Sequence, residues 1–302
     1  MRFIIYDPKT LLHHFFINCL KIELDKILSI HEVIIINSTF INYDRYDLKK
    51  DMILIFLNPQ FLKTDKDILN EFYKIAKLFI LKIQYITEPL DYLVDRKVWE
   101  NSIKILNPIF LWTYSYGNIG KLATSKKIFK ISPKFNEFYN FFYYNDFIHS
   151  IQKKRSDKII FIGNPDTESR KNIIKEFGEL LIIYDSIWDI ESWKKIISEN
   201  LFFLNIHRRS NSECLETFRI IPLLSNGCIV LSDIVCDDDM EEYRNYNIFF
   251  EKKEKLLSLF LDIQKNINYD NIYERMIAFR NKENMEKELF EKNDSFKMNF
   301  SK

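Results

Sequence analysis

The sequence predicts an α/β protein made of two Rossmann-like domains that face each other across a cleft. Short apolar runs alternate along the chain with stretches of helical periodicity, which is the pattern of a doubly wound parallel sheet. The alternation occurs twice, on either side of a charged stretch at residues 152–157 (QKKRSD). In addition, 302 residues are enough for two domains of average size. We therefore expect an N-terminal domain at residues 1–150 and a C-terminal domain at residues 151–302.

Each predicted strand is a short apolar run, and each predicted helix has apolar residues at a spacing of three and four. In the first half, strands are expected at residues 2–6, 33–36, 52–57, 78–83 and 109–113, and helices at 11–28, 64–77 and 90–106. In the second half, strands are expected at 158–162, 180–184, 201–206 and 228–231, and helices at 168–177, 191–199, 215–224, 254–266 and 272–287.

Composition limits the class of protein. Hydrophobic residues make up 47% of the chain and aromatic residues 16%, enough to fill two cores. The formal net charge is +1, so the sequence offers no argument for a nucleic-acid partner.

The cysteines and the apolar runs indicate the cellular compartment of the protein. The four cysteines form no CxxC pair and no zinc spacing, so we expect no metal site and a reducing compartment. The N-terminal apolar run is too short for a signal peptide, and no run is long enough for a membrane span. We therefore expect a cytoplasmic protein.

Polar residues follow the first apolar strand of the second half. Ligands of open α/β sheets bind beyond the carboxyl ends of the strands. Gly163 and Asn164 begin such a loop, and Arg170 follows in the first turn of the next predicted helix. The glycine allows a sharp turn, and the guanidinium group can bind phosphate with two parallel hydrogen bonds. The alternative interpretation is a capped helix that carries a surface arginine.

Two further loops of the second half are unusually polar. Asn205, His207 and Arg208 come directly at the end of an apolar strand, where a diphosphate or a sugar hydroxyl could bind. The alternative is a structural histidine whose hydrogen bonds are satisfied within the protein. Glu213, Glu216 and Arg219 form the third group, ahead of the apolar run at 228–231 and Ser232-Asp233. We expect Glu216 in the first turn of a helix with Arg219 one turn later, and an ordinary ion pair is the alternative.

The segments FIGNPDTESRKNI (161–173), LNIHR (204–208) and ETFRIIPLLSNGCIVLSD (216–233) resemble the C-terminal domain of a glycosyltransferase family. The resemblance is to the branch related to spore-maturation glycosyltransferases, which have two Rossmann-like domains in the GT-B architecture. The first half also fits, through YITEP (85–89) and IFLWTYSYGNIGKL (109–122).

The resemblance implies a hexosyl- or pentosyltransferase that moves a sugar from a nucleotide-diphosphate sugar to a glycan or another hydroxyl acceptor. Residues 151–302 would bind the donor and residues 1–150 the acceptor, without a cofactor and without a metal. The candidate catalytic residues are His207, Glu88 and Asp7. The candidate substrate-binding residues are Gly163, Asn164, Arg170, Asn205, Arg208, Glu213, Glu216 and Arg219. No Asp-x-Asp triplet occupies a suitable position for a metal, and we interpret the acidic run at 237–239 as a solvated loop.

The sequence departs from the family pattern at one position. Pro222 stands five residues before Gly227, where the family usually has a glutamate thought to hold the donor ribose. Glu216 is our first choice to replace it and Glu213 the second. The departure keeps open a non-catalytic nucleotide- or glycan-binding protein on the same fold, and a sugar epimerase is a third possibility.

Overall fold

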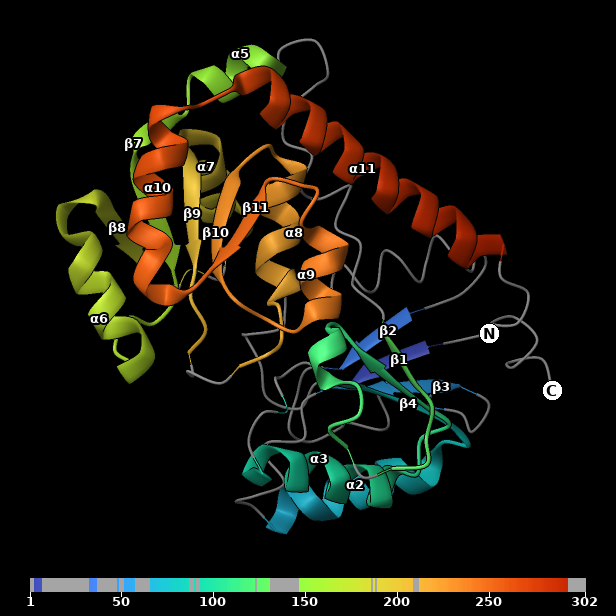
Figure 1. The fold of residues 1–302 in the computed structure, drawn as a ribbon. Helices are drawn as coiled ribbons and strands as arrows, with labels where there is room; N and C mark the ends of the chain where they lie inside the picture. The colour runs from blue at the N-terminus through green and yellow to red at the C-terminus, as the bar shows by residue number, and fades with distance from the viewer. Residues whose placement is uncertain are drawn as a thin grey trace. The chain divides into compact units, whose positions relative to one another are not determined.

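The computed structural model describes residues 3–6, 33–36, 48, 52–57, 66–86, 90, 93–122, 124–130, 147–185, 187, 189–208 and 212–292. The chain divides into two compact units (Figure 1). The first unit comprises Met1–Pro133 and Glu213–Thr217, and the second comprises Lys134–Ser212 and Phe218–Lys302. Within the described ranges, no helix has the length and apolar character that crossing a membrane requires.

The first unit contains a six-stranded sheet in the order β2-β1-β3-β4-β5-β6, and all its pairs are parallel. The strands are β1 (Phe3–Tyr6), β2 (Val33–Ile36), β3 (Ile53–Phe56), β4 (Leu81–Ile86), β5 (Phe110–Thr113) and β6 (Ile128–Lys130). Helices α2 (Lys66–Leu78) and α3 (Leu93–Leu106) pack side by side against one face (Figure 1). Since the chain advances in one direction from β3 to β5, right-handed crossovers place both helices on the same face.

A short segment from the second half of the sequence completes the first unit. Residues Glu213–Thr217 lie against the turn η2 (Tyr116–Asn118). A Cβ atom at Gly117 would lie 2.5 Å from the backbone oxygen of Glu213, so only glycine fits there. The Cys214 thiol lies 3.1 Å from the side-chain oxygen of Asn118, and both residues are fully buried. This tight contact fixes the segment directly before helix α8.

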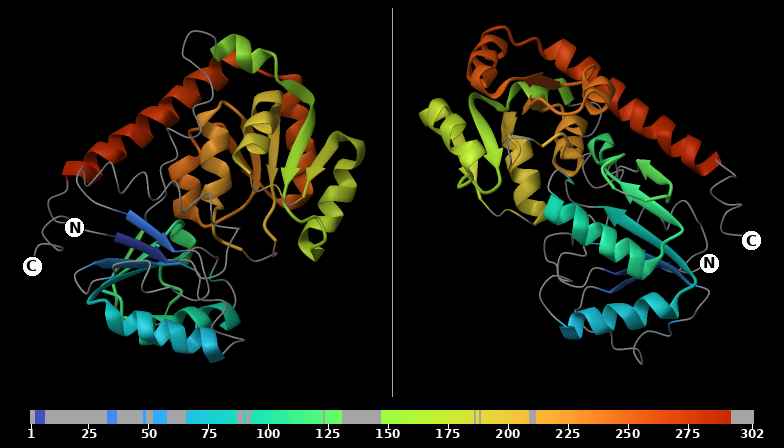
Figure 2. Two further views of the ribbon diagram at one scale, coloured as in Figure 1. Left: turned by 180° about the vertical axis from the view of Figure 1, so that it is seen from behind. Right: turned by 60° about the horizontal axis from the view of Figure 1, so that its bottom comes forward.

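The second unit contains a five-stranded parallel sheet in the order β11-β10-β9-β7-β8. The strands are β7 (Arg155–Ile162), β8 (Leu181–Tyr184), β9 (Asn200–Asn205), β10 (Ile229–Asp233) and β11 (Ile248–Glu251). The helices are α5 (Phe147–Gln152), α6 (Glu168–Phe177), α7 (Ile190–Glu199), α8 (Thr217–Ser225), α9 (Asp237–Tyr243), α10 (Leu256–Lys265) and α11 (Tyr269–Lys292). Helices cover both faces of the sheet, with α7 and α8 on the face turned toward the viewer in the left view of Figure 2.

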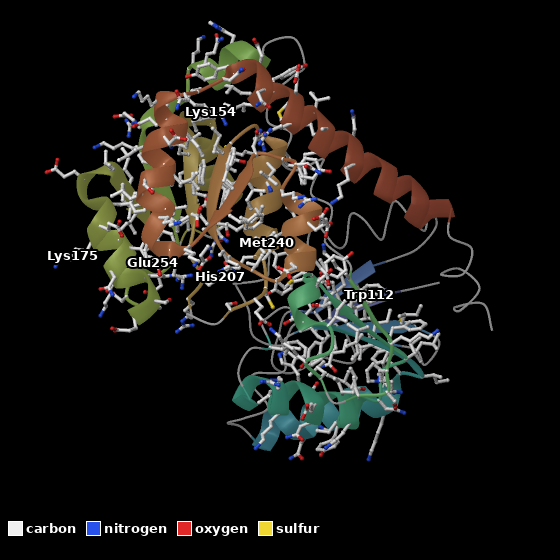
Figure 3. All side chains as sticks on the ribbon, in the orientation of Figure 1. Trp112, Lys154, Lys175, His207, Met240 and Glu254 are labelled. Atoms are coloured by element: carbon white, nitrogen blue, oxygen red, sulfur yellow. The ribbon has the colours of Figure 1, made fainter. Side chains whose placement is uncertain are left out.

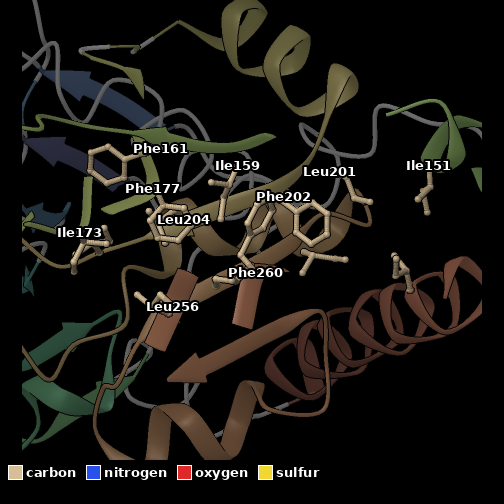
Figure 4. Packing of buried hydrophobic residues seen from close by; sticks show 14 of the residues in the cluster. Ile151, Ile159, Phe161, Ile173, Phe177, Leu201, Phe202, Leu204, Leu256 and Phe260 are labelled. Atoms are coloured by element: carbon tan, nitrogen blue, oxygen red, sulfur yellow. The ribbon is translucent and has the colours of Figure 1, made fainter. Parts of the chain in front are cut away.

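The core of the second unit lies between the sheet and helices α6, α10 and α11. Strand residues such as Phe161 and Phe202 meet Phe177 and Phe260 from the helices (Figure 4). The rings of Phe202 and Phe260 are 5.1 Å apart and nearly perpendicular, an arrangement that aromatic pairs favour. All four rings are buried, so this face of the sheet is a packed apolar layer that holds the strand ends in place.

Polar side chains are buried at the amino end of the same sheet. Lys154 precedes β7, and its ammonium group donates to the carbonyl of Asn226 at 2.9 Å and lies 3.3 Å from the Cys228 sulfur. Burial lowers the pKa of Lys154 and raises the pKa of the Cys228 thiol. The Asn226 side chain in turn donates to the carbonyl of Pro222, inside α8, at 2.8 Å. These groups therefore satisfy the carboxyl end of helix α8.

Most predicted elements are confirmed within a few residues, and the differences have local causes. The strand expected at 78–83 begins at Leu81, because helix α2 continues to Leu78. Strands β6 and β11 and helices α5 and α9 were not predicted from the sequence. The acidic run at 237–239 is the first turn of α9 rather than a loop, and Asp239 is fully buried. Carboxylates are favoured at this position by the helix dipole. The helix expected at 11–28 lies outside the described residues.

Candidate functional site

The strand order of the second unit points to one place in its sheet. Strand β7 has β8 on one side and β9 on the other, so the chain leaves β7 and β9 in opposite directions. In open α/β sheets such a switch point leaves a crevice outside the carboxyl ends of the strands, where ligands bind. The loops after β7 and β9 carry Gly163 and His207. The candidate residues of both loops therefore border the switch point.

Two guanidinium groups converge on Gly163. A Cβ atom at this glycine would lie 3.7 Å from Nη2 of Arg219 and 3.8 Å from Nη1 of Arg170. Arg170 comes from the first turn of α6 and Arg219 from the first turn of α8. Gly163 has a φ of 144°, a conformation that other residues rarely adopt. Two fixed cations beside an open glycine backbone form a suitable cradle for an anion such as a phosphate.

Arg170 holds the two strand ends together. Its Nε donates to the carbonyl of Ile206 at 3.0 Å, and its Nη1 donates to the carbonyl of Asn164 at 2.8 Å. The guanidinium group also stacks 5.1 Å above the ring of Phe161, and only 4% of the residue is exposed. The interpretation as a surface arginine is therefore wrong. Arg170 ties the loop after β7 to the loop after β9 across the switch point.

Arg219 belongs to a chain of side-chain hydrogen bonds. Its Nη1 donates to the side-chain oxygen of Asn205 at 3.2 Å. The Asn205 amide group donates to the hydroxyl of Ser232 at 2.9 Å. Asn205 and Ser232 are directly opposite each other in β9 and β10, and both are buried. Asn205 and Ser232, at the ends of β9 and β10, therefore orient the Arg219 side chain. Arg219 itself is half-buried.

His207, labelled in Figure 3, is buried after the end of β9. It contacts Asp233 at the end of β10. Its Nδ1 pairs with Oδ1 of Asp233, and its backbone N–H lies 3.3 Å from Oδ2. Lys253, which follows β11, lies 3.3 Å from Oδ2 as well. Ser169 of α6 donates its hydroxyl to the His207 carbonyl at 2.8 Å. These contacts connect His207 to β10 and α6 directly, and through Asp233 to the turn after β11.

The two glutamates belong to the first unit. Glu213 is exposed and pairs with Lys121 at 2.9 Å within the first unit. Glu216 belongs to the same short segment and directly precedes α8, whose first residue is Thr217. The expectation that Glu216 lies inside the helix is therefore wrong. The helix begins later because Glu213 and Cys214 are held against η2 and the Thr217 N–H donates to the Leu215 carbonyl at 2.8 Å instead of to a helical partner.

The remaining candidates are loop residues or lie outside the described ranges. Asn164 is exposed, and its side chain accepts from the backbone of Asp166 at 2.7 Å, while Arg208 is exposed beside His207. Asp7 and Glu88 lie outside the described residues. Among the residues that the structure describes, no three His, Cys, Asp or Glu side chains gather as possible metal ligands.

Sequence reasoning did not select Asp233 and Lys253 as site residues. Asp233 ends an apolar strand in the same way as Asn205 does, so the rule that selected Asn205 could have selected Asp233 too. Lys253 had no comparable signal, because it lies among several lysines and follows a strand that was not predicted.

Comparisons with known proteins give the fold of the whole chain. No protein-family profile matches the sequence, and no curated protein is similar to it in sequence. The structure is similar to that of Anabaena Alr3699/HepE in complex with UDP-glucose, with a TM-score of 0.53 and 8% identity over 94% of this chain and 98% of that one. HepE in complex with UDP and glucose gives a TM-score of 0.52 and 9% identity over 92% and 93%. The chain thus has the predicted fold of two Rossmann-like domains.

Proposed function

We propose that this protein is a glycosyltransferase that moves a sugar from a nucleotide-diphosphate sugar to a hydroxyl acceptor. The observation that carries the proposal is the convergence of Arg170 and Arg219 on the backbone of Gly163, at the switch point of the second sheet. The donor diphosphate would bind there, in the C-terminal domain. Support comes from the fold shared with HepE, which binds UDP and glucose. It also comes from the resemblance to the spore-maturation branch.

The charges of the site suit departure of a diphosphate without a metal. As the glycosidic bond breaks, negative charge grows on the leaving phosphate, and fixed cations in a dry site stabilise it. Arg170, Arg219 and His207 would supply this charge. We place the acceptor in the first unit, with Asp7 and Glu88 as candidate bases. The protein would act in a reducing compartment such as the cytoplasm, in keeping with the free thiols of Cys228 and Cys236.

The experiment that tests the proposal is calorimetry with a panel of nucleotide sugars that begins with UDP-glucose, followed by an assay for release of the nucleotide diphosphate. We expect binding of at least one donor and slow hydrolysis without an acceptor. Arg219→Gln should weaken binding, while Arg244→Gln, which changes an exposed arginine on α9, should not. Binding without any hydrolysis or transfer would favour the non-catalytic binding protein that Pro222 suggests. Binding of no donor would refute the transferase and would favour a protein that binds a glycan.

Glu216 is the residue that we expect to bind the donor ribose, because a carboxylate can accept from both of its hydroxyls. Glu216→Gln should lower the affinity for a ribonucleotide donor and barely affect a 2′,3′-dideoxy analogue. Folding should change by less than about 1 kcal/mol, the scale of an exposed polar contact. Calorimetry with the two ligands checks this, and equal losses for both would show that Glu216 does not contact the ribose.

A further inference from the structure

Asp233 has a position that a purely structural carboxylate would not need. It is buried at the end of β10 and has three neighbouring donors from two segments. These are the Nδ1 of His207, the backbone N–H of His207 and the ammonium group of Lys253. One carboxylate thus connects the loop after β9 to the turn after β11, across the end of its own strand.

The contact with Nδ1 determines the proton arrangement of the imidazole. A carboxylate only accepts, so a ring nitrogen paired with it must carry the proton. In the neutral ring this leaves the lone pair on Nε2, as the partner of the other nitrogen decides the tautomer. When the ring is protonated, the same carboxylate stabilises the imidazolium ion. Asp233 therefore sets the tautomer of His207 and favours its protonated form.

Other charges near His207 act in the opposite direction. Lys253 shares the Asp233 carboxylate and disfavours a second cation beside it. Arg170 contacts the carbonyl of Ile206, next to His207, and exposed Arg208 follows it. Ser169 donates its hydroxyl to the backbone carbonyls of His207 and Arg208, each at 2.8 Å, and not to the imidazole ring. The carboxylate paired with His207 is thus shared with Lys253, and arginines flank His207 in the sequence and at the Ile206 carbonyl.

We propose that Asp233 is a positioning residue, which holds His207 with Nδ1 protonated so that Nε2 serves the ligand, and that Lys253 moderates the charge of this pair. The role toward a donor diphosphate rests on the proposed function. With the ring protonated, His207, Asp233 and Lys253 together carry one net positive charge. With the ring neutral, the three groups carry none. Affinity for a diphosphate would therefore fall as pH rises and the ring loses its proton.

The first test needs no ligand. Nitrogen-resolved NMR of the imidazole rings, with the His207 signal identified by its absence in His207→Gln, reports the tautomer and the titration midpoint. We expect the Nδ1-protonated tautomer in the wild type. Asp233→Asn should move the midpoint to lower pH by about one unit or more, and Lys253→Gln should move it to higher pH. Glu241→Gln, an exposed control on α9, should leave it unchanged.

Opposite shifts in the two variants are the decisive result. An Nε2-protonated ring, or shifts of the same sign, would overturn the proposal. If Asp233→Asn does not fold, Lys253→Gln still tests it, because a shift to lower pH or no shift contradicts the arrangement.

The second test uses UDP and measures its affinity across the pH range. The affinity of the wild type should fall as pH rises through the His207 midpoint, and the inflection should move with that midpoint in both variants. His207→Gln should abolish the fall in affinity and leave only the titration of the terminal phosphate of UDP, whose second pKa is about 6. Absence of UDP binding would refute the role toward the donor and leave the NMR result standing, so the two failures are distinguishable.

Discussion

The two ends of the second sheet both bury polar side chains, but they use them differently. At the amino end, the polar side chains of Lys154, Asn226 and Arg280 donate to backbone carbonyls of α8 and the turn after it. At the carboxyl end, Arg219 bonds to Asn205, and Asp233 pairs with His207 and Lys253. The first pattern completes helix termini, and the second arranges ionisable groups around one another. Burial of polar residues alone therefore does not indicate a functional site. A site is indicated when their partners are other polar or ionisable side chains rather than backbone carbonyls.

Arg170 is the exception that belongs to both patterns, because it donates to two strand-end carbonyls at the carboxyl end. We expect the largest effect from Arg170→Ala. It removes two charged hydrogen bonds and the stacking on Phe161, and should lower the free energy of unfolding by about 3–5 kcal/mol. Affinity for a nucleotide diphosphate should fall by about 1.5–3 kcal/mol as well. Denaturant unfolding and calorimetry measure the two quantities. If the variant were as stable as the wild type, Arg170 would have a functional role only and no structural one.

Lys154→Ala tests the amino end. It leaves the Asn226 carbonyl without its donor and creates a cavity, so stability should fall by about 2–4 kcal/mol. Nucleotide affinity should not change in the folded variant. Because burial lowers the pKa of Lys154 in the folded state, the unfolded chain binds this proton more tightly. The contribution of Lys154 to stability should therefore grow as pH rises from the folded pKa toward 10.5.

Urea unfolding of the wild type and the variant at several pH values measures this difference. Cys228→Ala is the matched control, since it removes the sulfur neighbour and leaves the hydrogen bond to Asn226. A loss of nucleotide binding in folded Lys154→Ala would show that the amino end of the sheet also contributes to binding, and would contradict the comparison.

Arg219→Gln should have the reverse profile of Lys154→Ala. Arg219 is half-buried, so its loss should cost less than about 1 kcal/mol of stability. Nucleotide-diphosphate affinity should fall by about 1.5–3 kcal/mol, roughly 10- to 150-fold. Calorimetry alongside unfolding separates the two effects. A large loss of stability with unchanged affinity would move Arg219 to the structural group.

The smallest effect concerns Cys236, which lies at the carboxyl end directly before α9. Burial raises the pKa of its thiol to about 11, although the backbone N–H of Asp239 opposes this. The thiolate is the reactive form, so Cys236 should alkylate far more slowly than a free cysteine at pH 8. The rate should keep rising with pH up to about 11. Mass spectrometry after iodoacetamide treatment measures the rate, and rapid labelling at neutral pH would contradict this environment.

Sequence patterns were sufficient for the parts of the fold that depend on local periodicity. Apolar runs marked most strands, and the closeness of Arg170 to Gly163 follows from a strand, a sharp turn and one helical turn. Lys253 and Asp233 are 20 residues apart in the sequence and meet only because β10 and β11 are adjacent. Helix α9 was misread because its acidic residues resemble a solvated loop until the helix dipole is considered. Contacts such as that between Lys253 and Asp233 could not be predicted, because they depend on the strand order and no local sequence pattern encodes it.

The segment Glu213–Thr217 has a practical consequence for anyone who divides this chain. The polypeptide passes between the units three times, at 133/134, 212/213 and 217/218, so one cut does not separate them. A fragment that starts at Lys134 would carry Cys214 and Leu215, both fully buried in the intact protein, without the surface that covers them. A fragment that ends at Pro133 would lack the Glu213 backbone, which packs closely against Gly117. Genetic dissection of the two halves would therefore give two damaged pieces rather than two domains.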